Sequence, residues 1–292
     1  MSYGHSTSIV FFGSGPVAAA SLEFLAKHFS IEGVITKSVP AHHKGLAPVE
    51  ELTKKIHLPV YFASTKLELD NLVNSHKFNS QLGILVDYGV IVSQKAIDSF
   101  ELGIVNSHFS LLPEWRGADP ITFSILSGQE KTGVSVMLIE PTLDTGKLLT
   151  RKSIKIDINE TTPTLTARLI ELSNNLLAEF IPEYMDGLIK SKKQPHPNLA
   201  TYSRKLTKND GVIDWKKPAI QIEREIRAFQ GWPKSRSTID GKDIIITKAH
   251  VSGSKTNQLD VLCGDNKYLS IDELIAPSGR TMSAKAYING YL

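Results

Sequence analysis

The chain has 292 residues, of which 41% are apolar and 22% are charged. This composition is ordinary for a soluble globular protein and excludes wholesale disorder. The net charge is +3, and the single cysteine, Cys263, excludes an internal disulfide and a cysteine-clustered metal site. Since no apolar run approaches the roughly 20 residues that span a membrane, and residues 1–8 lack the pattern of a secretion signal, we expect a cytoplasmic protein with no membrane partner.

The first half of the chain alternates strand patterns with helix patterns. Apolar runs predict strands at 9–12, 33–36, 82–86 and 104–105, and helical spacing predicts helices at 17–27 and from Pro48 onward. This alternation predicts an α/β fold with a Rossmann-like, mostly parallel sheet and helices on both faces. The working groups of such sheets lie at the carboxyl ends of the strands.

The sheet is expected to continue beyond residue 110. Asp119 is a candidate side-chain cap for a helix that starts at Pro120. Strands are predicted at 134–138 and 148–158, and a long helix at 162–184.

The second half of the chain has a different rhythm. Residues 187–203, rich in Lys and Pro, predict an extended linker between a catalytic domain at 1–186 and a C-terminal domain at 204–292. A helix is expected at 220–229, followed by short strands at 243–247, 258–262 and 268–271 with turns between them. This pattern predicts a small β-barrel. Trp215 and Trp232 are expected to pack in a core or between domains.

Charge is divided unevenly between the two halves. Residues 190–292 hold 18 Lys and Arg against 10 Asp and Glu, a balance of +8, whereas residues 1–189 have a balance of −5. Such a split suggests that the second half binds a polyanion, although a solvated basic surface without a partner explains the same count.

Two polar residues follow a predicted buried strand. Asn106 and His108 are two positions apart, so in extended chain their side chains share one face. An amide beside an imidazole can polarise a carbonyl group and move protons, but taken alone the two residues fit a hydrogen-bonded structural pair better.

A carboxylate stands about 36 residues further on, in Leu143-Asp144-Thr145-Gly146. The residues Asp, Thr and Gly predict a tight turn, and Asp144 is either an ordinary turn residue or the partner that orients His108. Sequence spacing does not decide between these two interpretations.

Two other motifs point to little chemistry. Gly13-Ser14-Gly15-Pro16 lies where a dinucleotide-binding loop would lie, but position 18 is Ala and Pro16 interrupts the motif, so nicotinamide binding is not expected. His42 and His43 are adjacent and lack a carboxylate at ligand spacing. We therefore expect no metal.

The residues Asn106-x-His108, Ser110-Leu-Leu-Pro113, Arg116-Gly117, Pro120 and Leu143-Asp-Thr-Gly146 together resemble the signature of the 10-formyltetrahydrofolate-dependent formyltransferases. In the C-terminal half, Thr201–Leu206, Ile213-Asp-Trp215, Ile226–Phe229, Trp232-Pro233 and Met282-Ser-Ala284 resemble the second domain of those members that formylate methionyl-tRNA. The resemblance extends from Ile9 to about Tyr287.

The resemblance implies a fold, substrates and a site. It implies a C-terminal barrel of the oligonucleotide-binding type, 10-formyltetrahydrofolate as co-substrate and initiator methionyl-tRNA as acceptor, and we expect a monomer. Asn106 would be the oxyanion donor, His108 the proton shuttle, and Asp144 the group that orients His108 and acts as a base. The implied folate contacts are Asp87, Tyr88 and Gly89 after the fourth strand, and Ser110, Leu111, Leu112 and Pro113.

One stretch departs from the family pattern. Residues 36–45 are shorter and less basic than the loop that engages the tRNA acceptor end in the family, with Lys37 and Lys44 retained. The acceptor-stem contacts, and to a lesser degree the tRNA substrate, are therefore left open, and two alternatives stand beside the main interpretation. One is a formyltransferase whose acceptor is an amino-sugar nucleotide, and the other is an RNA-binding or regulatory protein with a silent catalytic domain.

Overall fold

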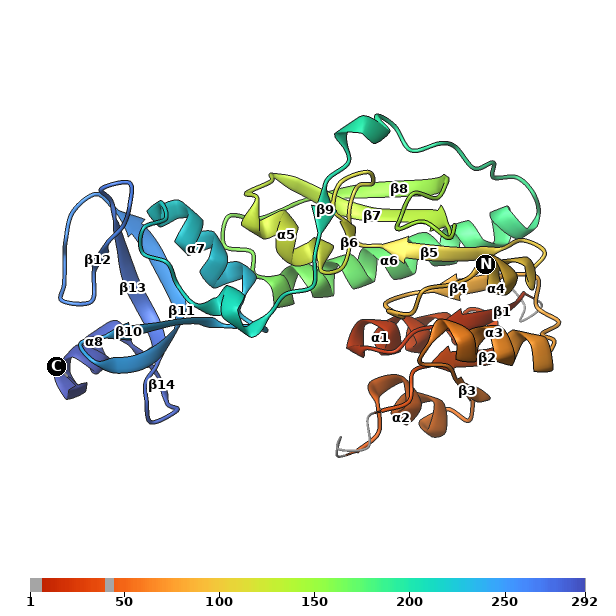
Figure 1. Cartoon of the computed structure of the whole chain (residues 1–292), viewed down its shortest axis with the longest axis horizontal. Coiled ribbons are helices and arrows are strands. Elements are labelled where there is room, and N and C mark those ends of the chain that lie inside the picture. The colour runs from red at the N-terminus through yellow and green to blue at the C-terminus, as the bar shows by residue number, and fades with distance from the viewer. Residues whose placement is uncertain (1–6, 40–44, 292) are drawn as a thin grey trace. The chain divides into compact units, whose positions relative to one another are not determined.

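The computed structural model describes residues 7–39 and 45–291 (Figure 1). These residues form two compact units. The first unit holds the described residues of 1–117 together with 133–154 and 168–202, and the second holds 118–132, 155–167 and those of 203–292. Both units therefore contain segments from either side of residue 150, and the predicted domain boundaries at 186 and 204 stay predictions.

The first unit is built on a seven-stranded sheet with the order β3-β2-β1-β4-β5-β7-β8. The first five strands of this order pair in parallel, and β7 runs antiparallel to β5. The strands are β1 (Ser8–Phe12), β2 (Ser30–Thr36), β3 (Val60–Phe62), β4 (Gly83–Leu85), β5 (Ile104–His108), β7 (Lys131–Leu138) and β8 (Leu148–Lys155).

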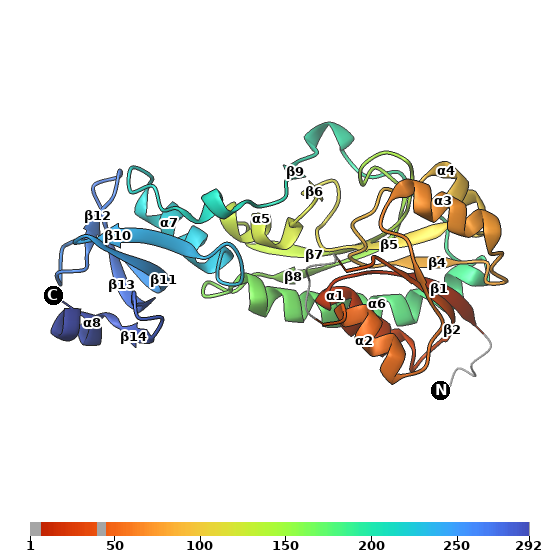
Figure 2. The same ribbon diagram turned by 60° about the horizontal axis from the view of Figure 1, so that its bottom comes forward.

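Helices cover both faces of this sheet, which confirms the predicted fold class. In Figure 2, α1 and α2 lie on the same face as α6, and α3 and α4 lie on the other face. The chain moves outward from β1 to β3 and then back through β4 to β5, and since parallel crossovers are right-handed, the two directions put their helices on opposite faces. The helices are α1 (Pro16–Leu25), α2 (Pro48–Lys55), α3 (Lys66–Ser75), α4 (Gln94–Asp98) and α6 (Thr162–Met185).

Aromatic side chains stabilise the α3–α4 side of the parallel sheet. Phe12 of β1 packs edge-on against Tyr88 and Phe100, with ring centroids 5.9 and 5.8 Å apart. Edge-to-face pairs of this kind add about 0.5–1.5 kcal/mol beyond the apolar area that they bury. These contacts hold β1 against the segments that follow β4 and α4.

The second unit contains a curled antiparallel sheet with the order β10-β11-β13-β12, in which β14 also pairs with β13. This sheet agrees with the predicted barrel. Its core is built of Ile, Leu and Ala side chains together with Cys263 and Tyr287. The elements are β10 (Ser235–Ile239), β11 (Lys242–Ser252), β12 (Val261–Leu262), β13 (Tyr268–Ile275), β14 (Thr281–Ser283), α5 (Pro120–Leu126), α7 (Ala219–Ala228) and α8 (Ala284–Tyr291).

Two details of the second unit correct the sequence analysis. Asp119 precedes α5 with φ of 56° and makes no side-chain cap; its carboxylate accepts a hydrogen bond from the Leu206 amide, 3.1 Å away. Trp215 packs against the core and donates to Ser237, as expected, but Trp232 is 57% exposed and does not lie in a core. No helix of the part of the chain that the structure describes is both long and apolar enough to cross a membrane.

Residues 187–203 follow an irregular course with several fixed points. They contain a 3₁₀ turn, η1 (Pro197–Leu199), and a short strand, β9 (Tyr202–Ser203), which pairs with β6 (Arg116–Gly117). Lys192 exchanges two backbone hydrogen bonds of 2.7 Å with Leu148 of β8. The segment is therefore fastened to the first unit at both ends.

The strand that carries Asn106 and His108 is anchored from beneath. Ser107 faces the opposite side of β5, where its hydroxyl lies 2.6 Å from that of the buried Ser173 on α6. Ser107→Ala is expected to destabilise the fold by about 1–3 kcal/mol because it leaves a buried hydroxyl without its partner. Urea unfolding should show that the double variant Ser107→Ala/Ser173→Ala loses less than the sum of the two single variants, and strictly additive losses would contradict this account.

Candidate active site

Asn106 and His108 lie side by side on β5, at the carboxyl end of the parallel part of the sheet. β5 is buried along its whole length between β4 and β7. Because Ser107 faces α6, the side chains of Asn106 and His108 both leave the sheet on the opposite face. The predicted pairing of an amide and an imidazole on one face is thus present.

The imidazole of His108 is held in one tautomer. Its Nε2 lies 2.9 Å from the carbonyl oxygen of Trp115. Since a carbonyl oxygen only accepts, Nε2 carries a hydrogen and donates it. Nδ1 is therefore the nitrogen that can take up or release a proton.

Asp144 faces that free nitrogen. Its Oδ2 lies 3.8 Å from Nδ1 of His108, which is ion-pair distance but too long for a direct hydrogen bond. The same Oδ2 accepts the backbone N–H of Gly117 at 2.7 Å. The structure thus brings together two residues that are 36 positions apart in the chain, and it aims the carboxylate with a backbone amide.

The turn that carries Asp144 has little freedom. Asp144 has φ of 49°, in the left-handed region. At Gly146 a Cβ would lie 1.7 Å from the carbonyl oxygen of Leu138, so the position admits only glycine. Gln194 donates from Nε2 to the carbonyl oxygens of both Asp144 and Gly146, at 2.7 and 3.0 Å.

Arg116 braces the other side of the turn. It is buried, and its Nη2 donates to Oε1 of Gln194 at 2.6 Å. Its backbone N–H donates to the carbonyl oxygen of Thr201 at 2.9 Å. Arg116 is thus a structural brace in the loop, and its burial keeps its guanidinium away from an external phosphate.

The loop 110–113 is fixed by hydrogen bonds to Ser135 of β7 and by one from its own Ser110. Ser135 of β7 donates its hydroxyl to the carbonyl oxygen of Ser110 at 2.7 Å and accepts the Leu112 amide at 3.0 Å. The hydroxyl of Ser110 donates to the carbonyl oxygen of Glu114, and Leu112 is fully buried. The side chains of Ser110 and Leu112 therefore hold the shape of the loop. Those of Leu111 and Pro113 are left to contact a ligand.

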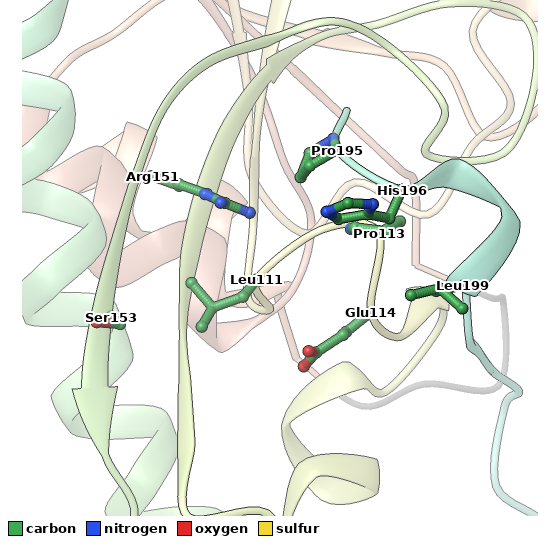
Figure 3. Close-up of a pocket in the computed structure, with 8 residues that line it drawn as sticks. All are labelled: Leu111, Pro113, Glu114, Arg151, Ser153, Pro195, His196 and Leu199. Carbon is green, nitrogen blue, oxygen red and sulfur yellow. The ribbon is translucent and has the colours of Figure 1, made fainter. Parts of the chain in front are cut away.

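Leu111 and Pro113 line a cavity of about 510 Å³ (Figure 3). Arg151 of β8 and His196 point into it with Glu114. The other lining residues are Ser153, Pro195 and Leu199. Asn106, His108 and Asp144 are not among the described residues that line this cavity.

The remaining predicted folate residues lie at the carboxyl end of β4. Asp87 is exposed and its carbonyl oxygen accepts the amide of Ser14 at 3.1 Å, while its carboxylate fills the space beside Gly15. Gly89 has φ of 69° and lies next to the ammonium group of Lys37. Tyr88 is buried, and its hydroxyl donates to the carbonyl oxygen of Ala63 at 2.6 Å, so its side chain packs into the core.

Some residues of interest were not identifiable from the sequence, and some lie outside the described residues. Gln194 stands within a run of Lys and Pro whose composition indicates a linker, so nothing marked it as part of a site. Ser135 is one polar residue inside an apolar strand, which is a weak signal. His42, His43 and Lys44 fall outside the described residues.

The arrangement has a clear chemical capability. The amide of Asn106 and the imidazole of His108 share one face of β5, and the carboxylate of Asp144 lies 3.8 Å from Nδ1 of the imidazole. Such a set can stabilise an oxyanion and relay a proton during direct transfer of an acyl group to an amine. The geometry of the site therefore supports acyl transfer on an α/β fold.

Comparison with known proteins identifies the family. Residues 8–181 match the formyl transferase family model, and residues 205–292 match the model of the formyl transferase C-terminal domain. The chain therefore belongs to the formyl transferase family, and it is a formyltransferase.

Relatives extend along nearly the whole chain. A methionyl-tRNA formyltransferase of Pseudomonas putida (strain GB-1) is 35% identical, covering 96% of this chain and 95% of the relative. The methionyl-tRNA formyltransferase of Coxiella burnetii (strain RSA 331 / Henzerling II) is 34% identical, covering 84% of this chain and 81% of the relative. Among solved structures, an N-formyltransferase of Helicobacter canadensis shares the fold with a TM-score of 0.70 at 18% identity, covering 91% of this chain and 98% of that one.

The tautomer of His108 provides a test of the site geometry. We expect the neutral ring to carry its hydrogen on Nε2, because that atom donates to the carbonyl oxygen of Trp115. Long-range ¹H–¹⁵N NMR spectra of the histidine side chains, with His108→Gln used to assign the signal, report the tautomer directly. A neutral ring protonated at Nδ1 would contradict the geometry.

Proposed function

We propose that this enzyme transfers the formyl group of 10-formyltetrahydrofolate to the free amino group of initiator methionyl-tRNA. The observation that carries the chemistry is the carboxylate of Asp144 facing Nδ1 of His108 at 3.8 Å, on the face of β5 that also presents Asn106. The choice of acceptor rests on the relatives that are named methionyl-tRNA formyltransferases and extend over nearly the full chain.

In the proposed reaction the methionyl amine attacks the formyl carbon. A new C–N bond forms, the bond from the formyl carbon to N10 of the folate breaks, and one proton passes from the amine to N10. Asn106 donates a hydrogen bond to the oxygen on which negative charge develops, and losing one such donor typically costs about 100- to 1000-fold in rate.

His108 and Asp144 would manage the proton. Nδ1 of His108 accepts the proton that the attacking amine loses and returns it to the departing nitrogen. The carboxylate of Asp144 stabilises the imidazolium that forms in between, and it is preorganised by the Gly117 amide, so it need not reorient during the reaction. Holding the two substrates together would supply much of the remaining acceleration.

The folate would bind along the carboxyl edge of the sheet. We assign its pterin to the loop that follows β4, where Asp87 and Gly89 are exposed on either side of the buried Tyr88, and the Ser110–Pro113 loop would shape the adjoining wall. The solved N-formyltransferase of Helicobacter canadensis is described in complex with folinic acid and dTDP-3-aminofucose. That description supports a folate donor for this fold.

A basic surface of the second unit would bind the tRNA. Lys208 and Lys234 are exposed on adjoining segments, since Arg236 donates to the carbonyl oxygen of Lys208. Lys205 is exposed nearby in the chain, and Trp232 presents an exposed ring. Lysines contact phosphates, and an exposed indole can stack on a base. Part of the basic excess is already used within the protein, by Arg204 with Asp210 and Lys217 with Glu225.

An amino-sugar nucleotide is the second candidate acceptor. The fold shared with the Helicobacter canadensis enzyme, whose complex contains dTDP-3-aminofucose, favours it. The reaction would be the same, with a sugar amine in place of the methionyl amine.

The test is to offer formyl-labelled 10-formyltetrahydrofolate together with initiator methionyl-tRNA and a dTDP-linked amino sugar. We expect the label on the methionyl-tRNA, and uncharged tRNA serves as the control because it lacks the amine. Label on the sugar alone would overturn the proposed acceptor, and label on neither would overturn the proposed function.

A further inference from the structure

We propose that Gln194 is a positioning residue for formyl transfer, acting through Asp144; this inference rests on the proposed function. The residue comes from the segment whose sequence indicates a linker, yet its side chain is buried and contacts both segments that hold the Asp144 carboxylate in place. It would therefore influence the reaction without contacting either substrate.

The amide of Gln194 is used at both ends. Nε2 donates to the carbonyl oxygens of Asp144 and Gly146 at 2.7 and 3.0 Å, and Oε1 accepts from Nη2 of Arg116 at 2.6 Å. Both hydrogens of the NH₂ group are therefore engaged. A buried amide with its donors and its acceptor engaged favours one geometry. A shift of the Asp144 turn would break these hydrogen bonds inside the protein.

These contacts close a ring around the carboxylate. Gln194 holds the backbone of Asp144, the side chain of Asp144 accepts the amide of Gly117, and Gly117 follows Arg116, which returns to Gln194. The ring fixes the position of the Asp144 backbone relative to the amide that aims its side chain. His108 lies just outside the ring, with its Nδ1 3.8 Å from the same carboxylate oxygen.

The segment that carries Gln194 is itself fixed on either side. Two positions earlier, Lys192 exchanges backbone hydrogen bonds of 2.7 Å with Leu148. Seven positions later, Thr201 binds Pro113 and Arg116 through its backbone, and its hydroxyl accepts the Trp115 amide at 2.9 Å. Trp115 in turn supplies the carbonyl oxygen that fixes the tautomer of His108. One segment thus supports the surroundings of both His108 and Asp144.

The chemistry of the contacts requires an amide at this position. A glutamate keeps the acceptor for Arg116 but turns a carboxylate oxygen toward the carbonyl oxygens of Asp144 and Gly146, and two acceptors repel one another. A methionine has a similar shape and makes none of these hydrogen bonds. The pair Gln194→Glu and Gln194→Met therefore separates the hold on the Asp144 turn from the contact with Arg116.

Steady-state kinetics with 10-formyltetrahydrofolate and methionyl-tRNA test the proposal. We expect kcat to fall about 10- to 100-fold in both variants, since small misplacements of a reacting group carry losses of this size. KM for each substrate should stay within about twofold of wild type, because Gln194 contacts neither. Gln258→Glu, a substitution at an exposed position of the second unit, is the matched control and should leave both parameters unchanged.

A double-variant cycle distinguishes positioning from a general structural role. If Gln194 acts through Asp144, then Gln194→Glu in an Asp144→Asn background should cost less than about twofold in single-turnover rate. Losses that multiply in full would overturn the proposal. Gln194→Glu retains the Arg116 contact, so it decides the question if Gln194→Met fails to fold.

The remaining outcomes are separate. Wild-type activity together with undiminished kcat in a folded Gln194→Glu variant would overturn the role of Gln194 and leave the proposed function intact. A wild-type enzyme that formylates neither methionyl-tRNA nor an amino sugar would overturn the proposed function, and with it the role of Gln194.

Discussion

The position of the Asp144 carboxylate is the constraint on which the rest of the site depends. A carboxylate on a surface turn has many orientations, and only a few place an oxygen opposite Nδ1 of His108. Here the orientation is set by one backbone amide, that of Gly117, 2.7 Å from Oδ2, and by the hold of Gln194 on the turn itself. Both partners, the Gly117 amide and Gln194, thus come from parts of the chain far from residue 144.

Hydrogen bonds between loops explain why these distant segments meet. β7 runs antiparallel beside β5, so the turn that leaves β7 starts next to Val105, and the hydrogen bond from the Gly117 amide to Asp144 joins this turn to the loop that leaves β5. The loop contributes the carbonyl oxygen of Trp115 and the amide of Gly117, and the turn contributes Asp144. The hydrogen bonds of the Asp144 turn to Gly117 and Gln194 are therefore what hold Asp144 facing His108.

Much of this could be predicted from the sequence because the signals are local. Buried parallel strands are continuous apolar runs, and the pair Asn106 and His108 follows one of them at the spacing that puts two side chains on one face. The family pattern linked this pair to Asp144. The structure then supplied their separation of 3.8 Å, which the 36 positions between them do not reveal.

The rest depends on contacts that leave no local trace. Asp119 has the residue type and place of a helix cap, but its backbone enters the left-handed region and its carboxylate binds Leu206 instead. Gln194 lies among lysines and prolines typical of a linker, and only the folded chain shows that its amide is buried against the Asp144 turn. In both cases the partner is 50 or more positions away, beyond the reach of periodicity and turn rules.

The most direct test of the account is the single-turnover rate of formyl transfer by Asp144→Asn. Asparagine keeps the size of the side chain and an oxygen for the Gly117 amide, but it carries no charge to stabilise the imidazolium of His108. With donor and methionyl-tRNA saturating, the account predicts a loss of about 100- to 10,000-fold with tRNA affinity unchanged. A folded Asp144→Asn variant that transfers the formyl group at the wild-type rate would contradict it.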